Sequence, residues 1–433
     1  MSAATGMETG LAIDGGCATV QGSHAELFHW PIVTADDEAA VLAVLRSGKM
    51  SGIEITKQFE SEFAAWHGAR FALAHCNGTA SLHAAMWACG VGRGDEIIGP
   101  SMTYWASVLP ALNLGANVVF ADVDPNSLTI DPQDIARRIT PRTKAIVAVH
   151  YCGHPCDMDP IMALAREHGI KVIEDNSHAQ GARYKGRLTG TLGDIAGISL
   201  MSGKSLACGE GGMLLTSDPE LYERAVAFGH YERTGGPSRY TNSESALTAD
   251  ALKKFAGVPL GGFKYRINQL SSALGRGQLK HYAARIHEIQ RAMNRFWKLL
   301  EGTPGIRPHR IALPDSDMGG WYNPLGLYAA EELCGTPVEK FCAAVRAEGV
   351  ESNPGANLPL HAHPVFHTAD IYGDGRPTNQ PAARCGALPV TEAVQRRCFT
   401  VPWFKHDRPE IISQYAAAFK KVARALSSRR SPR

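Results

Sequence analysis

Short apolar runs that alternate with helical segments constrain the fold of this chain more than any other feature. The runs expected to form strands are 71–75, 96–99, 117–122, 144–150 and 171–175. They are rich in Val, Ile and Ala along their whole length, which is typical of strands that are buried on both faces of a sheet. The sequence therefore predicts an α/β fold in which a mostly parallel sheet is covered by helices.

The domain organisation is predicted from a change in this pattern. A long helix is expected over 269–301, and the elements after it are short and mixed. We therefore expect a large domain of residues 28–285 and a smaller C-terminal α+β domain of residues 286–433. Residues 1–27 are rich in Gly, Ala, Ser and Thr without a sustained period, so we expect a flexible leader there. Residues 235–257, rich in Ser, Thr and Gly, are expected to form a surface excursion of the large domain.

Composition excludes several classes of partner. The formal net charge is +2, from 44 basic and 42 acidic residues, and no internal basic block stands out, so no nucleic acid is expected as a partner. The chain contains no apolar run of about 18 residues and no N-terminal signal pattern, so no membrane partner is expected. Ten cysteines are scattered without a paired framework, which indicates free thiols in a reducing compartment. We therefore expect a cytoplasmic protein.

One short stretch of the sequence contains four potential metal ligands. His150, Cys152, His154 and Cys156 lie within seven residues. Their spacing matches no usual zinc pattern, and no second ligand pair follows at a finger-like distance. We expect a strand end followed by a tight turn, and no metal.

Lys204 and Asp175 together indicate pyridoxal phosphate as the cofactor. Asp175 ends an apolar strand, and Lys204 follows about thirty residues later in a Gly-rich and Ser-rich stretch. A lysine can form a Schiff base with the cofactor aldehyde, and an aspartate can keep the pyridine nitrogen protonated so that the ring accepts electrons. An unpaired buried carboxylate is costly, and the protonated ring would be its partner.

A nucleotide-binding loop is the competing interpretation of the same lysine. The sequence Gly203-Lys-Ser resembles the end of a phosphate-binding loop of the nucleotide-triphosphatase type. That motif requires four residues between its first glycine and the Gly-Lys pair, whereas five separate Gly197 from Gly203. The spacing disfavours this alternative.

Further candidates lie near the ends of the predicted strands. Gly78 and Thr79 begin a predicted helix after the first strand, where backbone amides can bind a phosphate, although ordinary helix caps have the same composition. Tyr104 follows the next strand and could stack on a planar cofactor, although an isolated aromatic residue more often packs in a core. Ser199 precedes Lys204 by five residues and could donate a hydrogen bond to the cofactor phosphate.

Several motifs in a fixed order resemble those of one known family. They are Cys76-Asn-Gly-Thr-Ala-Ser-Leu-His-Ala-Ala, Asp122-Val-Asp-Pro, Gly153-His-Pro-Cys-Asp-Met-Asp-Pro, Glu174-Asp-Asn-Ser-His-Ala-Gln-Gly-Ala and Gly209-Glu-Gly-Gly. The set resembles the DegT/DnrJ/EryC1/StrS family of pyridoxal-phosphate-dependent sugar and cyclitol aminotransferases. The matches extend from about Phe28 to Trp403. The resemblance implies fold type I, the aspartate aminotransferase class, and a homodimer whose active sites are shared between subunits.

The resemblance also implies roles for individual residues. Lys204 matches the Schiff-base lysine, and Asp175 matches the partner of the pyridinium nitrogen. The matches to other cofactor contacts are His178 near the phenolic oxygen, Tyr104 as the stacking aromatic, and Gly78, Thr79 and Ser199 at the phosphate. Lys264 stands where the family usually has an asparagine that reaches the cofactor phosphate of the neighbouring subunit. A lysine at that position could form an ion pair with the phosphate.

These observations predict a transaminase. By resemblance, the donor is glutamate or glutamine, and the acceptor is a keto-sugar or keto-cyclitol, free or nucleotide-linked, in a ping-pong mechanism. Two alternatives stay open: a dehydratase relative, disfavoured because such relatives typically have His in place of the Schiff-base lysine, and a non-catalytic regulatory or sensory member. Candidate substrate contacts, which could equally be ordinary surface or interface residues, are His230, Tyr231, Tyr322, Asn323 and His361.

Overall fold

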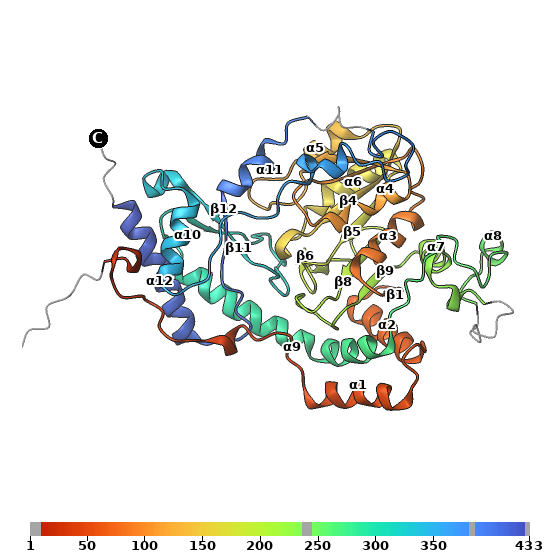
Figure 1. The fold of residues 1–433 in the computed structure, drawn as a ribbon, viewed down its shortest axis with the longest axis horizontal. Coiled ribbons are helices and arrows are strands. Elements are labelled where there is room, and N and C mark those ends of the chain that lie inside the picture. Colours follow the sequence, from red (N-terminus) through yellow and green to blue (C-terminus); the bar gives the residue numbers. More distant parts are fainter. Residues whose placement is uncertain (1–9, 236–244, 381–385, 429–433) are drawn as a thin grey trace, which may run out of the picture.

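The computed structural model describes residues 10–235, 245–380 and 386–428 (Figure 1). Residues 1–9 of the predicted leader and residues 236–244 of the predicted excursion lie outside the described residues.

The large domain is built on a central sheet that has seven strands within the described residues. In spatial order they are β1 (Phe71–His75), β9 (Gly212–Thr216), β8 (Ile195–Ser199), β5 (Lys171–Asp175), β4 (Thr143–Val149), β2 (Glu96–Pro100) and β3 (Asn117–Ala121). β9 pairs antiparallel with both of its neighbours, and the remaining pairs are parallel. The prediction of a mostly parallel sheet covered by helices is therefore confirmed.

Helices cover both faces of this sheet because successive strand residues point to opposite sides. In β2, Ile97 packs against the helices of one face and Ile98 against those of the other. The first face is covered by α3 (Gly78–Ala88), α4 (Pro110–Asn113) and α7 (Pro219–Gly229). The opposite face is covered by α2 (Glu54–His67), α5 (Pro132–Arg138), α6 (Met158–His168) and the first half of α9 (Gln269–Leu299). α3 is apolar around almost its whole circumference, as expected for a helix packed between α7 and the sheet.

Further short elements complete the large domain. They are α1 (Ala35–Ser47), the hairpin of β6 (Arg183–Tyr184) and β7 (Arg187–Leu188), and α8 (Asp250–Lys253). α1 begins with a capping box in which Thr34 and Asp37 satisfy each other's backbone amides, and it packs along α9.

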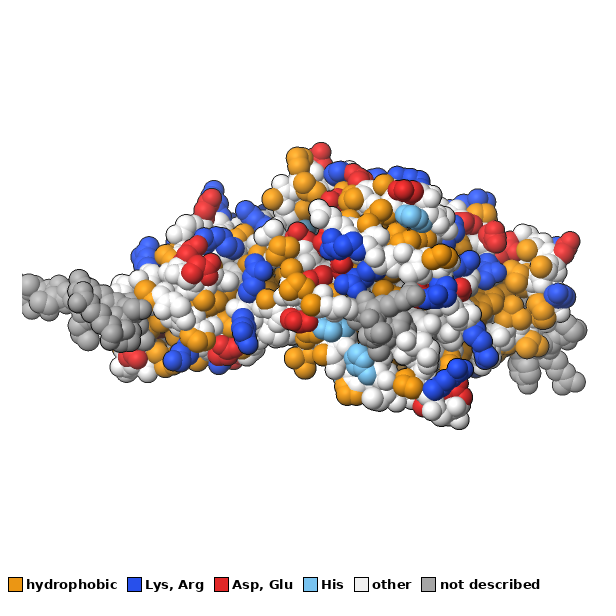
Figure 2. All heavy atoms as spheres, turned by 90° about the horizontal axis from the view of Figure 1, so that it is seen from above, with side chains coloured by type: hydrophobic (Ala, Val, Ile, Leu, Met, Phe, Trp, Pro, Cys, Tyr) orange, Lys and Arg blue, Asp and Glu red, His pale blue; other side chains and the backbone are white. Residues whose placement is uncertain are grey.

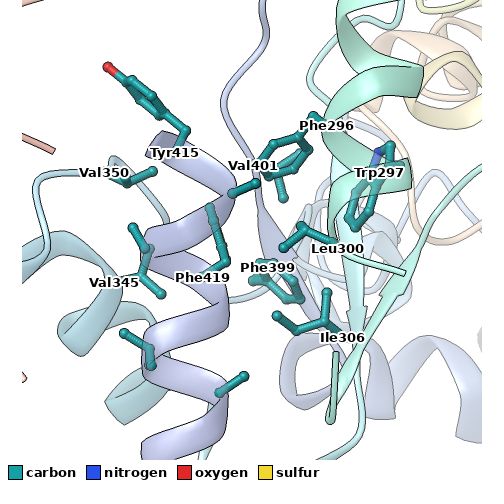
Figure 3. Packing of buried hydrophobic residues seen from close by; sticks show 14 of the residues in the cluster. Phe296, Trp297, Leu300, Ile306, Val345, Val350, Phe399, Val401, Tyr415 and Phe419 are labelled. Carbon is teal, nitrogen blue, oxygen red and sulfur yellow. The ribbon is translucent and has the colours of Figure 1, made fainter. Parts of the chain in front are cut away.

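In the described part of the small domain, two helices pack with a three-stranded sheet. Its elements are β10 (Ile306–Pro308), β11 (Leu325–Tyr328), α10 (Val338–Ala347), β12 (Cys398–Thr400) and α12 (Pro409–Ser427). Phe296 and Trp297 near the end of α9 pack with Phe399 and Phe419 in its core (Figure 3). The predicted domain boundary at residues 285 and 286 therefore falls within α9, which runs from one domain into the other (Figure 1).

The described part of the predicted leader packs against the small domain, so the expectation of flexibility is wrong for residues 10–27. Leu11, Val20 and Leu27 are buried in the small-domain core. The buried Glu348 carboxylate accepts hydrogen bonds from the Ala12 and Thr19 amides at 2.8 and 3.0 Å. These apolar residues are widely spaced, which is why no period revealed them.

A second long segment, described over residues 355–380 and 386–393, contacts the large domain and includes α11 (Pro389–Ala393). The Asn379 side chain pairs with the Val118 amide at 2.8 Å, which covers part of the edge strand β3. Asn357 accepts a hydrogen bond from the Tyr151 hydroxyl at 2.7 Å, which brings this segment to the carboxyl end of β4.

The surface has no strong separation of charge on the face drawn in Figure 2. Basic and acidic side chains lie among one another there, in line with the nearly equal numbers of each in the chain. Across the described residues, no helix is both long and apolar enough to cross a membrane.

Candidate active site

A cavity of about 400 Å³ opens at the carboxyl ends of the parallel strands, where ligands bind in sheets of this kind. It is lined by the start of α3, the loop after β2, the end of β5, the loop after β8, and the small domain. The polar and aromatic residues that line it are Asn77, Thr79, Tyr104, Ser107, Asp175, Ser177, His178, Ser199, Lys204, Glu210, Tyr322, Asn323 and Asn357. A wider groove of about 1130 Å³ lies elsewhere and contains none of the predicted site residues.

Lys204 reaches this cavity as a largely buried amine. The residue is only 7 % exposed, and its Nζ lies 3.9 Å from the centre of the Tyr322 ring. Burial lowers the pKa of Lys204 to about 8, although the negative charges of Asp175 and of a deprotonated Cys152 would act in the opposite direction. About a tenth of the amine is therefore neutral at pH 7, far more than for an ordinary lysine, and the neutral amine is the nucleophilic form.

Asp175 is buried at the end of β5 and is oriented by two hydrogen bonds. Oδ2 accepts from the Ser107 hydroxyl at 2.6 Å, and Oδ1 accepts from the Ser177 amide at 3.0 Å. The Ser107 hydroxyl also lies 2.8 Å from the Thr103 hydroxyl, which fixes its rotamer. The carboxylate therefore presents a fixed direction to a ligand in the cavity.

The N-terminus of α3 forms another part of the cavity wall. The Asn77 side chain accepts from the Ala80 amide at 2.8 Å, which leaves the first two amides of the helix, those of Gly78 and Thr79, available to an anion. A Cβ atom at position 78 would lie 2.7 Å from Cβ of Ser199, so only glycine fits there. The Ser199 amide donates to the Ser177 hydroxyl at 3.0 Å, which ties the end of β8 to the segment after β5.

Tyr104 and His178 offer two further kinds of contact. Tyr104 is 50 % exposed and lines the cavity. His178 is buried, and burial together with the nearby Lys204 charge places its pKa well below its usual value of 6.5. Its Nδ1 accepts from the Cys152 amide at 3.3 Å, so the neutral ring carries its proton on Nε2. The histidine can therefore donate a hydrogen bond to an oxygen atom of a ligand.

Comparison with known proteins identifies the family of this chain. The sequence pattern of the DegT/DnrJ/EryC1/StrS aminotransferase family matches residues 31–417. The chain belongs to this family. Its fold is the fold type I of pyridoxal-phosphate enzymes, and its enzyme class is that of the pyridoxal-phosphate-dependent aminotransferases.

Individual relatives are similar over most of their length. The chain is 34% identical to the spore coat polysaccharide biosynthesis protein SpsC of Bacillus subtilis, over 79% of this chain and 86% of that protein. The structure of an aminotransferase from Psychrobacter cryohalolentis superimposes with a TM-score of 0.78 at 29% identity, covering 92% of this chain and 99% of the other. DesV of S. venezuelae, solved in complex with a ketimine intermediate, gives 0.73 at 29% identity and covers 92% and 95%.

Most of the predicted cofactor residues of this family member lie around the one cavity. They are Gly78, Thr79, Tyr104, Asp175, His178, Ser199 and Lys204. Lys264 does not line it: it is exposed on a segment that runs beside the edge strand β1, where the Cys76 amide donates to the Tyr265 carbonyl at 2.7 Å.

The predicted substrate residues divide into two groups. Tyr322 and Asn323 line the cavity, whereas His230, Tyr231 and His361 do not. His230 is fully buried, with its ring 4.6 Å from that of His75 behind β1. His361 packs on the large domain through Nδ1, 2.7 Å from the Ser101 hydroxyl. The positions of His230, Tyr231 and His361 therefore do not support the prediction that they contact the substrate.

Eight residues that line the cavity were not predicted from the sequence: Asn77, Leu82, Ala106, Ser107, Ser177, Met201, Glu210 and Asn357. Ser107 lies in the same loop as Tyr104, so its position three residues further on was a usable signal. Asn357 had no signal, because it belongs to an irregular segment that reaches the cavity only through its contact with Tyr151 of the large domain.

The His/Cys cluster of residues 150–156 supports the ends of two strands. His150 is fully buried, its Nε2 donates to the Glu174 carboxylate at 2.8 Å, and its Nδ1 accepts from the Cys156 amide at 3.0 Å. Glu174 also accepts from the amides of Gly190 and Gly193, both at 2.7 Å. This network holds β4 and β5 together next to Asp175.

Proposed function

We propose that this protein transfers an amino group from glutamate or glutamine to a keto-sugar or keto-cyclitol by a ping-pong mechanism. One observation carries the proposal: a buried amine, Lys204, and a buried carboxylate, Asp175, line the same cavity as the N-terminus of α3. A sugar-type acceptor is supported by the similarity to SpsC, which is named for polysaccharide biosynthesis.

The residues of the cavity fit pyridoxal phosphate. Asp175 would pair with the pyridine nitrogen, and His178 would donate to the phenolic oxygen. The Tyr104 ring, half-exposed beside the cavity, would cover one face of the cofactor ring. The amides of Gly78 and Thr79 and the hydroxyls of Thr79 and Ser199 would bind the phosphate, because this is where the helix leaves amides unpaired and where Gly78 allows close approach. When bound, the cofactor supplies an electron sink for the carbon that bears the amino group.

The protein side chains then have defined tasks. The Lys204 amine, with a pKa of about 8, can take a proton from the substrate carbon and return it, because a base works best when its pKa lies near the working pH. Tyr322 restricts where Nζ can lie. Ser107 and Ser177 fix the orientation of the Asp175 carboxylate, which would pair with the pyridine nitrogen of a bound cofactor.

We further propose a homodimer in which Lys264 of each subunit reaches the phosphate site of the other. Lys264 is exposed, and it belongs to a segment that is itself fixed along β1 by the backbone of Tyr265. Mixing inactive Lys204→Ala subunits with Lys264→Ala subunits tests this. A mixed dimer contains one site with both lysines intact, so activity should reappear on mixing, and no recovery would contradict the shared site.

The reaction class is tested by the visible absorbance of the protein bound to pyridoxal phosphate. Glutamate or glutamine should remove the band at which the Lys204-bound cofactor absorbs, and a keto-sugar or keto-cyclitol should restore it. Lys204→Ala should abolish both changes, whereas Lys340→Ala, which removes an exposed lysine of the small domain, should retain them. A band that no amino donor alters would contradict the aminotransferase assignment for this chain.

A further inference from the structure

We infer that Trp30, in the N-terminal segment (residues 10–30), is a positioning residue that holds the backbone of Lys204. The indole Nε1 of Trp30 donates a hydrogen bond to the Lys204 carbonyl oxygen at 2.8 Å. The inference rests on the proposed function, because it matters for the reaction only if Lys204 is the Schiff-base lysine.

The hydrogen bond from Trp30 complements the contact at the other end of the same residue. Tyr322 of the small domain holds the Lys204 amine at 3.9 Å from its ring centre, while Trp30 holds the carbonyl. A lysine side chain has four rotatable bonds, so fixing the amine requires that its backbone also be fixed. Trp30 and Tyr322 together define where the amine can reach.

Trp30 is itself held firmly in place. Cζ of Arg285 and Nζ of Lys405 lie 5.8 and 5.2 Å from the centre of its ring. The Lys405 amide donates to the Leu27 carbonyl at 2.9 Å, which ties the chain just before Trp30 to the segment after β12. The side chain that contacts the lysine is therefore fixed by both domains.

The start of the N-terminal segment is anchored to the small domain. Glu348 accepts from the Ala12 amide and from the Thr19 hydroxyl at 2.8 and 2.6 Å, and the Val20 amide donates to the Glu348 carbonyl at 2.9 Å. The segment thus connects the small-domain core to the lysine loop.

The rest of the lysine loop has its own support, which makes the contribution of Trp30 separable. The Gln180 side chain accepts from the Leu206 amide at 2.6 Å and donates to the Ser199 carbonyl at 2.6 Å. Loss of the indole N–H should therefore leave the loop folded but allow the Lys204 backbone to shift. We expect an effect of about 10-fold, as for the loss of one well-aligned hydrogen bond.

The test replaces Trp30 by phenylalanine and by benzothienylalanine, which keeps the bicyclic shape and removes the N–H donor. Trp297→Phe is the control, because Trp297 is buried and its Nε1 has no hydrogen-bond partner among the described residues. Without cofactor, we measure the rate at which acetic anhydride labels Lys204 as a function of pH, by peptide mass spectrometry. With cofactor, we measure how fast the absorbance band forms after pyridoxal phosphate is added.

Both Trp30 variants should raise the pH at which labelling of Lys204 is half-maximal. They should also slow the formation of the absorbance band by about 10-fold, while Trp297→Phe should change neither quantity. Unchanged midpoints and rates in the benzothienylalanine protein would overturn the inference even if Trp30→Phe folds poorly. A failure of the proposed function looks different: cofactor would then not attach to Lys204 in the unmodified protein.

Discussion

Lys405 provides the sharpest test of the physical account, because it is a buried amine without a hydrogen bond. The residue is 3 % exposed, and among the described residues its Nζ has no hydrogen-bond partner. Nζ lies over the ring of Trp403 and 5.2 Å from the centre of the Trp30 ring. Burial lowers the pKa of Lys405 from 10.5 to about 5, so the amine should be neutral at pH 7 in the folded protein and charged in the unfolded chain.

This difference makes a definite contribution to stability. Because the folded pKa is lower than the unfolded one, the unfolded chain binds one more proton between pH 5 and 10.5, and the free energy of unfolding rises with pH across that window. Each pH unit is equivalent to about 1.4 kcal/mol. At pH 7 the neutral amine therefore costs up to about 5 kcal/mol, a cost that Lys405→Met removes with an unbranched apolar side chain that is one atom shorter.

The assay is urea-induced unfolding at fixed protein concentration and without cofactor, at pH 6, 7, 8 and 9. Lys405→Met should be more stable than the unmodified protein, and its advantage should shrink by about 1.4 kcal/mol with each unit of rising pH. Lys340→Met, at an exposed site, should show no such trend. A stability difference that does not vary with pH would refute the reasoning, because it would mean that the ammonium stays charged between the two indoles.

Three further predictions concern the site and its support. Asp175→Asn should slow the half-reaction with the amino donor by about 100-fold or more, measured by stopped-flow absorbance, and an unchanged rate would remove Asp175 from its role. Ser107→Ala deletes the 2.6 Å hydrogen bond to Asp175 and should slow the same half-reaction by about 10-fold with little change in melting temperature; a loss of stability without a rate effect would make Ser107 merely structural. Glu348→Gln should destabilise the protein by about 1–3 kcal/mol near pH 7. Burial alone would raise the pKa of Glu348, but hydrogen bonds from Thr19 and Ala12 and the Lys421 ammonium hold it below 4.5, so this difference should vanish in acid unfolding curves as the pH falls through the folded pKa.

The central strands could be predicted from the sequence because their signal is local. β1 and β5 coincide with the expected runs 71–75 and 171–175, since each has a short apolar stretch that is followed by a polar residue at the end of the strand. The reversed direction of β9 could not be predicted, because pairing with β8 and β1 is decided by contacts between distant segments. The burial of Leu11 and Val20 could not be predicted either, because two isolated apolar residues do not form a periodic pattern.

Some residues of the candidate site could likewise be predicted from the sequence, and others could not. Lys204 and Asp175 could be identified because an amine and a strand-end carboxylate point to specific chemistry at known positions of an α/β fold. His230 was misplaced because it is adjacent in sequence to plausible site residues but lies behind β1, against His75. Nothing in the sequence around Trp30 indicates its hydrogen bond to Lys204. The two residues are far apart in the chain, and only the folded path of the N-terminal segment brings them together.

The most direct test of the central claim is to identify the residue that carries the cofactor. The protein is loaded with pyridoxal phosphate, reduced with sodium borohydride and digested, and the peptide that bears the pyridoxyl group is sequenced by mass spectrometry. Our account predicts that the group is attached to Lys204 and that prior incubation with glutamate or glutamine prevents the attachment. A modified lysine elsewhere, or no modified lysine at all, would contradict the assignment of this cavity as the active site.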